Sequence, residues 1–145
     1  MSMDRLKQQL KRHEGYTDYP YQDTVGIWTA GYGHNLESHG EAIQSVTLEQ
    51  AEQWLDEDIA HAIQIARMIF PTFDTLSEAR REVLVNMAFN LGNRLAQFHG
   101  LQRAVASEEW ESARNSMLAS KWARQVKGRA VELAEQMENE TIKEA

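Results

Sequence analysis

The feature that constrains the fold most is a long stretch of helical periodicity in the middle of the chain. Between Thr47 and Pro71, apolar residues recur at intervals of three and four for more than twenty positions. Thr47 and Gln50 form a capping box at its start, and Pro71 stops the pattern. The sequence therefore predicts a helix over about 47–69, long enough to join two lobes of a small protein.

The segment before this helix has two different patterns. Met3, Leu6 and Leu10 recur at helical spacing, which predicts an amphipathic helix over 3–13 with Glu14 at its end. From residue 16 to residue 34 the pattern changes to aromatic residues, threonine and glycine, with the turn-like sequence Asp23-Thr24-Val25-Gly26. This is the one plausible β region, and it predicts a small sheet.

The segment after Pro71 is helical throughout. Thr75 and Glu78 offer a second capping box, and the helix that follows is stopped by Gly92. Shorter helices are expected over 95–106, 108–119 and 127–138.

These elements predict an α+β fold that is predominantly α-helical. At 145 residues the chain fits one domain. We expect a β-containing lobe over about 14–46, the connecting helix over 47–69, and a helical lobe over about 72–138, with the helix at 3–13 packing on that helical lobe.

Composition excludes several functions. The chain has no cysteine, so it offers no disulfide, thiolate metal site or cysteine nucleophile. Its five histidines show no paired-ligand spacing, so we expect no metal and no cofactor. The net charge of −7 argues against nucleic-acid binding. No apolar segment has the length of a signal peptide or membrane anchor, so we expect neither in this chain.

A polar constellation near the start carries the candidate chemistry. Eight residues separate Glu14 from Asp23, and five separate Asp23 from Thr29. This spacing can put an acid, a base and a water-positioning hydroxyl around one cleft. Glycoside cleavage needs one carboxylic acid to protonate the leaving oxygen and an ionised carboxylate on the other side. Burial or a nearby negative charge must then raise the pKa of the acid.

Each of these residues also has an ordinary structural explanation. Glu14 is a carboxylate at a helix end, Asp23 suits a turn, and Thr29 is a common strand residue. Their register with Gly15, Gly26 and the series Gly31-Tyr32-Gly33-His34 favours the functional interpretation for Glu14, Asp23 and Thr29.

The constellation and its setting resemble the phage-type lysozymes, glycoside hydrolase family 24. A second block matches this family far downstream, at Asn86-Met87-Ala88-Phe89-Asn90-Leu91-Gly92, then Phe98, Trp110, Trp122 and Gly128-Arg129-Ala130. The resemblance spans roughly the first 130 residues. It implies a lysozyme-like, two-lobed fold with a small hairpin sheet, a long connecting helix and a helical lobe.

The resemblance also implies roles for individual residues. Glu14 matches the proton donor, Asp23 the second catalytic carboxylate and Thr29 the residue that positions the attacking water. Phe89 matches a substrate-contact position, although core packing explains it as well, and Arg129 matches an arginine near the catalytic glutamate. The implied substrate-binding positions are Asn35, Phe89 and Arg129; at Asn35, Leu101 and Ser116 the sequence departs from the best-known member.

The function that the resemblance implies is that of an endolysin. Such a muramidase hydrolyses the β-1,4 bond between N-acetylmuramic acid and N-acetylglucosamine in peptidoglycan and thereby lyses the host of a bacteriophage. Glu14, Asp23 and Thr29 together indicate an inverting mechanism, although the separation of the carboxyl groups decides between inversion and retention. The alternatives are a lytic transglycosylase, which needs only the acid, and a non-catalytic saccharide-binding relative.

Partners and location follow from the same resemblance. We expect a monomer that is made in the host cytoplasm, acts on the periplasmic cell wall and depends on a holin for release, with no stable membrane insertion. Residues 112–131 contain five basic residues and no acidic one, Arg114, Lys121, Arg124, Lys127 and Arg129. This basic stretch either steers the protein onto an anionic wall or is an ordinary solvated face.

Overall fold

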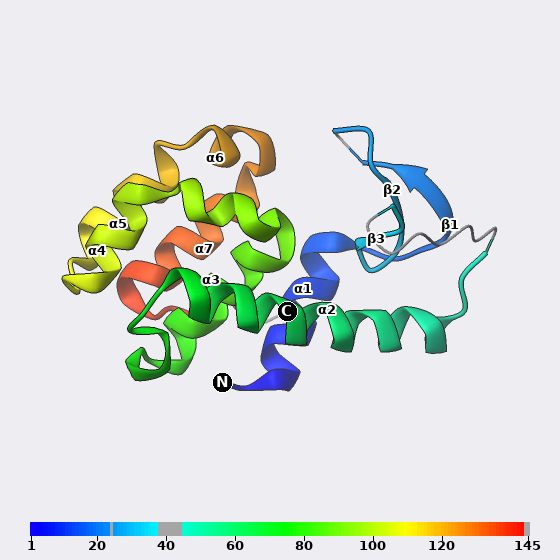
Figure 1. Cartoon of the computed structure of the whole chain (residues 1–145), viewed down its shortest axis with the longest axis horizontal. Coiled ribbons are helices and arrows are strands. Elements are labelled where there is room, and N and C mark those ends of the chain that lie inside the picture. The colour runs from blue at the N-terminus through cyan, green and yellow to red at the C-terminus, as the bar shows by residue number, and fades with distance from the viewer. Residues whose placement is uncertain (24, 38–44, 144–145) are drawn as a thin grey trace. The chain divides into compact units, whose positions relative to one another are not determined.

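A computed structural model describes residues 1–23, 25–37 and 45–143 (Figure 1). The chain divides into two compact units. We call Met3–Ala60 the sheet unit, and His61–Ala145 together with Met1–Ser2 the helical unit. The expected α+β fold, mostly helical with a small antiparallel sheet, is confirmed.

The sheet unit contains a helix and three short strands. Helix α1 (Met3–Glu14) is followed by β1 (Thr17–Gln22), β2 (Trp28–Gly31) and β3 (His34–Asn35), which form an antiparallel sheet in the order β1-β2-β3. Strands β1 and β2 lie in the region where the sequence predicted a sheet, residues 16–34, and β3 begins at its last residue. The expected packing of the helix at 3–13 on the helical lobe stays a prediction, since the residues of α1 group with the sheet unit.

The register of the sheet separates its two faces. Tyr21 pairs with Thr29, and Thr29 pairs in turn with Asn35, so these three side chains form one row on the same face. Ala30 and His34 pair on the opposite face. That face belongs to a buried cluster formed by Ala30, Leu36, Val46, Ala51 and Trp54.

Helix α2 (Leu48–Ile69) is the long helix that the sequence predicted. The Thr47 hydroxyl accepts a hydrogen bond from the Gln50 amide at 3.1 Å, so the expected cap is present. The boundary between the two units falls inside α2, between Ala60 and His61.

The helical unit contains the rest of α2 and five further α-helices in its described residues. These are α3 (Glu78–Leu91), α4 (His99–Ala106), α5 (Trp110–Leu118), α6 (Lys121–Val126) and α7 (Gly128–Asn139), with short 3-10 helices at Phe73–Thr75 and Gly92–Gln97. Buried leucine, valine and methionine side chains from α3, α4, α5 and α7 form its core.

Three details of this unit differ from the sequence-based predictions. The predicted capping box at Thr75 is wrong: Ser77 is the N-cap of α3, and its hydroxyl accepts from the Arg80 amide. Thr75 belongs to the preceding 3-10 turn, where its hydroxyl donates to the Thr72 carbonyl. Helix α4 begins at His99 rather than at residue 95, and the short helix α6 was not predicted.

The end of α7 is fixed to α3 by one arginine. Arg80 donates to the carbonyl oxygens of Met137 and Glu138, each at 2.7 Å, and its guanidinium lies 3.9 Å from the centre of the Trp110 ring. Carbonyl groups at a helix end have no partner within the helix, so Arg80 supplies one.

Candidate active site

Glu14 is the last residue of α1, and its carboxyl group lies against Gly33. Gly33 has a φ of +68°, a conformation that residues with a Cβ rarely adopt. A Cβ at position 33 would lie 2.8 Å from Glu14 Cδ, closer than atoms of this kind approach. Gly33 therefore provides both the backbone turn and the space that the Glu14 carboxyl occupies.

Asp23 and Thr29 are held together through the backbone of Ile27. The Ile27 amide donates to Asp23 Oδ1 at 2.9 Å, and the Ile27 carbonyl accepts from the Asp23 amide at 2.9 Å. The same carbonyl accepts from the Thr29 hydroxyl at 2.9 Å. The backbone of Ile27 thus fixes both predicted catalytic side chains. Thr24, which belongs to the same motif, lies outside the described residues.

These hydrogen bonds determine which oxygen atoms of Asp23 and Thr29 can still bind a water molecule. Asp23 Oδ1 accepts from the amides of both Val25 and Ile27, so Oδ2 is the oxygen that these bonds leave available. The single hydroxyl proton of Thr29 is used on the Ile27 carbonyl, so Oγ1 acts toward water as an acceptor.

Tyr21 is a further residue of this region that the sequence analysis did not select. It lies directly across from Thr29 on β1, and its side chain is half-buried. Burial raises the pKa of the Tyr21 phenol above its ordinary value of 10.0, and the negative charges of Glu14 and Asp23 raise that pKa further.

His34 supports the hairpin from the other face of the sheet. Its ring is 1% exposed, its Nδ1 lies 2.8 Å from Asp58 Oδ2, and it stacks on Trp54 at a centroid distance of 4.1 Å. His34 therefore supports the hairpin through a hydrogen bond and a ring stack. Because His34 follows Gly33 directly, this pairing also fixes the turn that contacts Glu14.

Two of the predicted substrate-binding residues belong to the helical unit. Phe89 is half-buried near the end of α3. Arg129 donates through Nε and Nη2 to Oδ1 of the fully buried Asn86, at 3.1 and 2.8 Å. Asn86 thus orients the guanidinium. The roles of Phe89 and Arg129 toward a substrate, and that of Asn35 on β3, stay predictions.

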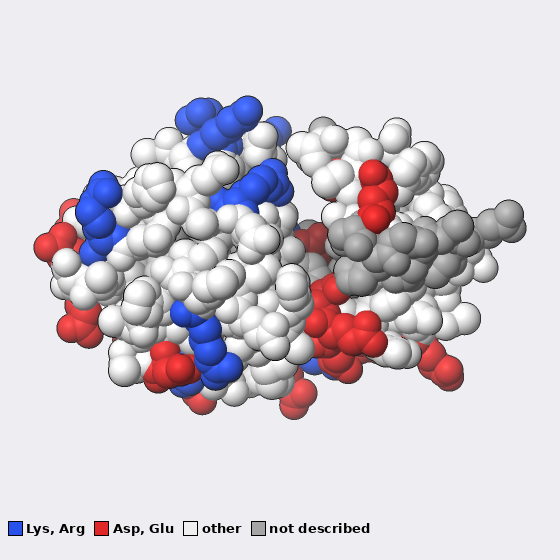
Figure 2. Space-filling view, viewed as in Figure 1, with Lys and Arg blue, Asp and Glu red and all other residues white. Residues whose placement is uncertain are grey.

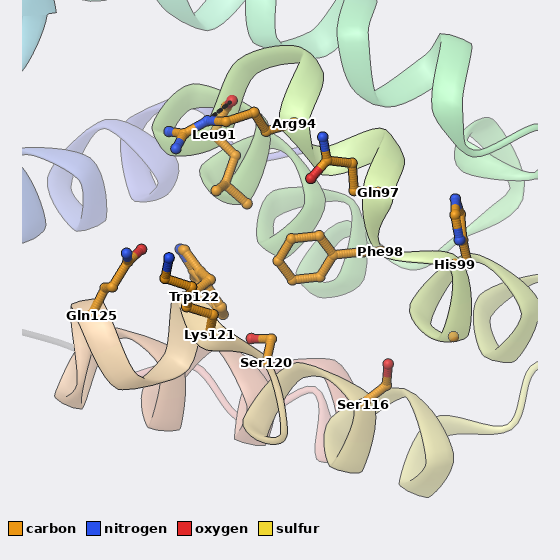
Figure 3. Close-up of a pocket in the computed structure, with 11 residues that line it drawn as sticks. Leu91, Arg94, Gln97, Phe98, His99, Ser116, Ser120, Lys121, Trp122 and Gln125 are labelled. Atoms are coloured by element: carbon orange, nitrogen blue, oxygen red, sulfur yellow. Dashed lines mark hydrogen bonds between the residues drawn. The ribbon is translucent and has the colours of Figure 1, made fainter. Parts of the chain in front are cut away.

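The helical unit also contains a pocket of about 470 Å³ (Figure 3). Phe98 and Trp122 line it and meet edge to face at 6.1 Å, and Trp122 Nε1 donates to Asn90 Oδ1 at 2.6 Å. Polar side chains complete the wall: Arg94, Gln97, His99, Ser116, Ser120, Lys121 and Gln125. Ser116 therefore faces a concave surface, whereas Leu101 is fully buried in the core.

Basic side chains gather over α6 in the helical unit (Figure 2). Lys121, Arg124 and Lys127 are exposed, whereas Arg114 lies 3.4 Å from Glu138. The basic stretch is therefore a surface feature in a chain of net charge −7. In the described residues, no three histidine, aspartate or glutamate side chains gather where they could hold a metal ion. The helices among them include none that is long and apolar enough to cross a membrane.

The sequence matches the phage lysozyme family over residues 11–140. The chain belongs to the phage lysozyme family, and the expected family membership is confirmed.

Individual relatives come from phages and from an amoeba. The chain is 28% identical over 149 aligned positions to the pre-baseplate central spike protein Gp5 of Enterobacteria phage T4, covering 86% of this chain. It is 31% identical over 126 positions to the peptidoglycan hydrolase gp36 of Pseudomonas phage phiKMV, again covering 86% of this chain. These alignments span 26% of the T4 protein and 14% of the phiKMV protein. Probable T4-type lysozyme 1 of Dictyostelium discoideum is 24% identical, with 94% of this chain and 95% of that protein covered.

Proposed function

We propose that the protein is a muramidase of the endolysin type, which hydrolyses the β-1,4 bond between N-acetylmuramic acid and N-acetylglucosamine in peptidoglycan. The observation that carries the proposal is the joint geometry of the hairpin. The Glu14 carboxyl lies against Gly33, and the Ile27 backbone binds both Asp23 and Thr29. Family membership supports the same chemistry.

In the proposed mechanism Glu14 is the general acid. It transfers its proton to the glycosidic oxygen as the bond to the anomeric carbon breaks, and the leaving sugar departs as an alcohol. A water donates one hydrogen bond to Asp23 Oδ2 and another to Thr29 Oγ1. These two hydrogen bonds direct a lone pair of the water oxygen at the anomeric carbon. Asp23 accepts the proton that the attacking water loses. This arrangement inverts the configuration at the anomeric carbon.

The biological setting is part of the proposal. The protein acts as a monomer on the periplasmic cell wall after synthesis in the host cytoplasm, and a holin releases it. Asn35, Phe89 and Arg129 contact the saccharide or orient the acid. Of the three, Asn35 belongs to the sheet unit, where it pairs directly with Thr29.

The test compares Glu14→Gln, Asp23→Asn and Thr29→Ala with the parent protein on purified peptidoglycan. Loss of a general acid or base costs about 10²–10⁴-fold in rate, so we expect reducing-end release to fall by that factor for the first two variants and by less for Thr29→Ala. Glu49→Gln is the matched control, because Glu49 is an exposed glutamate in the first turn of α2.

The products separate the competing functions. Reducing ends identify hydrolysis, and mass spectrometry would reveal the anhydro sugars of a transglycosylase. Full activity in a folded Glu14→Gln variant would refute the proposed acid. Anhydro products together with an active Asp23→Asn variant would favour the transglycosylase, and binding without any cleavage would favour a saccharide-binding relative.

A further inference from the structure

An open groove lies between the end of α5, helix α6 and the start of α7 in the helical unit. It has a volume of about 380 Å³, and its apolar lining comes from Leu118, Ala123, Ala130 and Val131. Val131 is 51% exposed, so a branched apolar side chain faces solvent at the groove. A partner with an apolar part would gain free energy by covering this surface.

Two basic side chains line the same groove. Arg124 and Lys127 are both exposed. No acidic residue is among the described residues that line the groove, and residues 112–131 contain none. The next acidic residue along the chain is Glu132, which is half-buried. The groove therefore combines an apolar floor with local positive charge.

This local charge, rather than the net charge of −7, decides what the groove attracts at close range. The Debye length is about 8 Å at physiological ionic strength, so charges on more distant parts of the surface are largely screened. Basic side chains gather over α6 (Figure 2). An anionic partner that approaches this face therefore meets positive charge first.

The backbone of Lys127 is strained where α6 meets α7. Its φ is +53°, a conformation that costs folding free energy in a residue with a Cβ and that glycine adopts without steric cost. Folding stability therefore does not account for a lysine at this position. The side chain that stands there is one of the two cations of the groove.

We propose that this groove is a docking surface for an anionic phospholipid bilayer. Arg124 and Lys127 contact the lipid phosphates, and Val131 enters the boundary between the headgroups and the acyl chains. A phospholipid joins an anionic group to an apolar chain and so matches both parts of the groove, whereas an anionic wall polymer would leave the apolar floor uncovered. Such docking is peripheral and reversible, because it uses few basic residues and one partly exposed apolar side chain.

The first experiment measures binding of the full chain to sedimented lipid vesicles. The parent should bind vesicles of phosphatidylglycerol and phosphatidylcholine in equal parts, and it should not bind vesicles of phosphatidylcholine alone. Each basic residue near an anionic bilayer strengthens binding about fivefold, so the double variant Arg124→Gln, Lys127→Gln should bind about 25-fold more weakly.

The matched control is the double variant Arg103→Gln, Lys143→Gln. Both residues are exposed and neither lines the groove, so the control changes the net charge by the same amount. Its vesicle binding should equal that of the parent. Equal binding by the parent and the Arg124→Gln, Lys127→Gln variant, or equal binding of the parent to both kinds of vesicle, would overturn the proposal.

The second experiment separates a lipid from an anionic polymer. Burial of the exposed part of Val131 contributes a factor of about five, so Val131→Ser should bind the anionic vesicles about fivefold more weakly. The same variant should bind polyphosphate, which has no apolar part, as the parent does. Unchanged vesicle binding by Val131→Ser would refute the lipid and leave a site for anions alone.

A third variant separates docking from stability. Lys127→Gly should weaken vesicle binding about fivefold, as one lost charge predicts, and should raise the unfolding temperature because it removes the backbone strain. A folded Lys127→Gly variant that binds vesicles as the parent does would contradict the role of Lys127. These measurements use no peptidoglycan, so their result does not depend on the muramidase function.

Discussion

The sheet unit and the helical unit are stabilised by different kinds of interaction. Among the described residues, 24 buried apolar side chains belong to the helical unit and nine to the sheet unit. The sheet unit instead contains a concentrated set of polar contacts. His34 pairs with Asp58, Lys7 and Lys11 pair with Glu52, and Ile27 bonds to Asp23 through its backbone.

Because of this difference, we expect substitutions in the two units to have different effects on activity and on stability. The candidate catalytic side chains of the sheet unit lie on short strands and turns, where a single backbone atom decides their position. The helical unit distributes its stability over many apolar contacts. Apart from Phe89 and from Arg129 with its partner Asn86, substitutions in the helical unit should therefore reduce stability more than activity, and substitutions in the sheet unit should do the reverse.

The largest effect that would test this difference is expected for Gly33→Ala. The new Cβ would displace the Glu14 carboxyl, which is the flexible end of its side chain and moves at little cost in stability. We expect kcat to fall at least about 100-fold, as for a misplaced catalytic group. The left-handed backbone costs a further ~1 kcal/mol of folding free energy. Reducing-end release and thermal unfolding measure the two effects.

Gly92→Ala is the control for backbone strain. Gly92 ends α3 with a φ of +58°, and a Cβ there would meet no atom within 4 Å. This variant should lose stability and keep the kcat of the parent. If Gly33→Ala and Gly92→Ala behaved alike in kcat, the contact between Gly33 and Glu14 would have no catalytic importance.

Much of the fold was predictable because its strongest signals are local. The long helix was predicted over 47–69 and observed at Leu48–Ile69, since periodicity and both end signals lie in the same segment. Helix α6 was missed because its six residues are too few to show periodicity. The N-cap of α3 was misplaced because Thr75 and Ser77 both precede helical sequence, and only the structure shows that Thr75 belongs to a separate turn.

The sequence indicated the candidate site residues but not which of them contact one another. The spacing of Glu14, Asp23 and Thr29 indicated glycosidase chemistry, although their roles stay predictions. Tyr21 was missed because an aromatic residue in a strand is usually a packing residue. The turn from Asp23 to Gly26 did contain a signal, because a hairpin closed there places Tyr21 opposite Thr29. The contact between Gly33 and Glu14 joins separate elements, and periodicity does not report such contacts.

A smaller effect, on stability, is expected for Arg80→Ala in the helical unit. The variant loses two charge-assisted hydrogen bonds to the end of α7 and the stacking on Trp110. We expect a loss of about 2 kcal/mol in the free energy of unfolding, with kcat unchanged below the unfolding temperature. Arg67→Ala is the control, because Arg67 is 54% exposed and should lose less than ~1 kcal/mol. A kcat loss in folded Arg80→Ala would contradict the separation of the two units.

The smallest effect is expected for the ion pairs between α1 and α2 in the sheet unit. Lys11 binds Glu52, and Lys7 lies 3.4 Å from Glu52 and 2.8 Å from Asp56. The hydrogen bond from Lys11 lowers the pKa of Glu52 below its ordinary value of 4.5. Folding therefore favours the ionised form. The resulting stabilisation is fully present above pH 4.5, and it is lost as the pH falls through the lower pKa of the folded state.

Glu52→Gln should accordingly lower the free energy of unfolding at neutral pH and should have little effect in acid, where the parent carboxylate is protonated as well. Because Glu52 is 37% exposed, solvent screening limits the loss to less than about 1 kcal/mol, and added salt should reduce it further. Denaturant unfolding of the variant and the parent at both pH values measures the difference, with Glu49→Gln as the exposed control on the same helix. An equal loss of unfolding free energy in acid and at neutral pH would show that Glu52 stabilises the sheet unit by packing rather than by charge. The contrast between a polar sheet unit and an apolar helical unit would then be weaker than the contacts indicate.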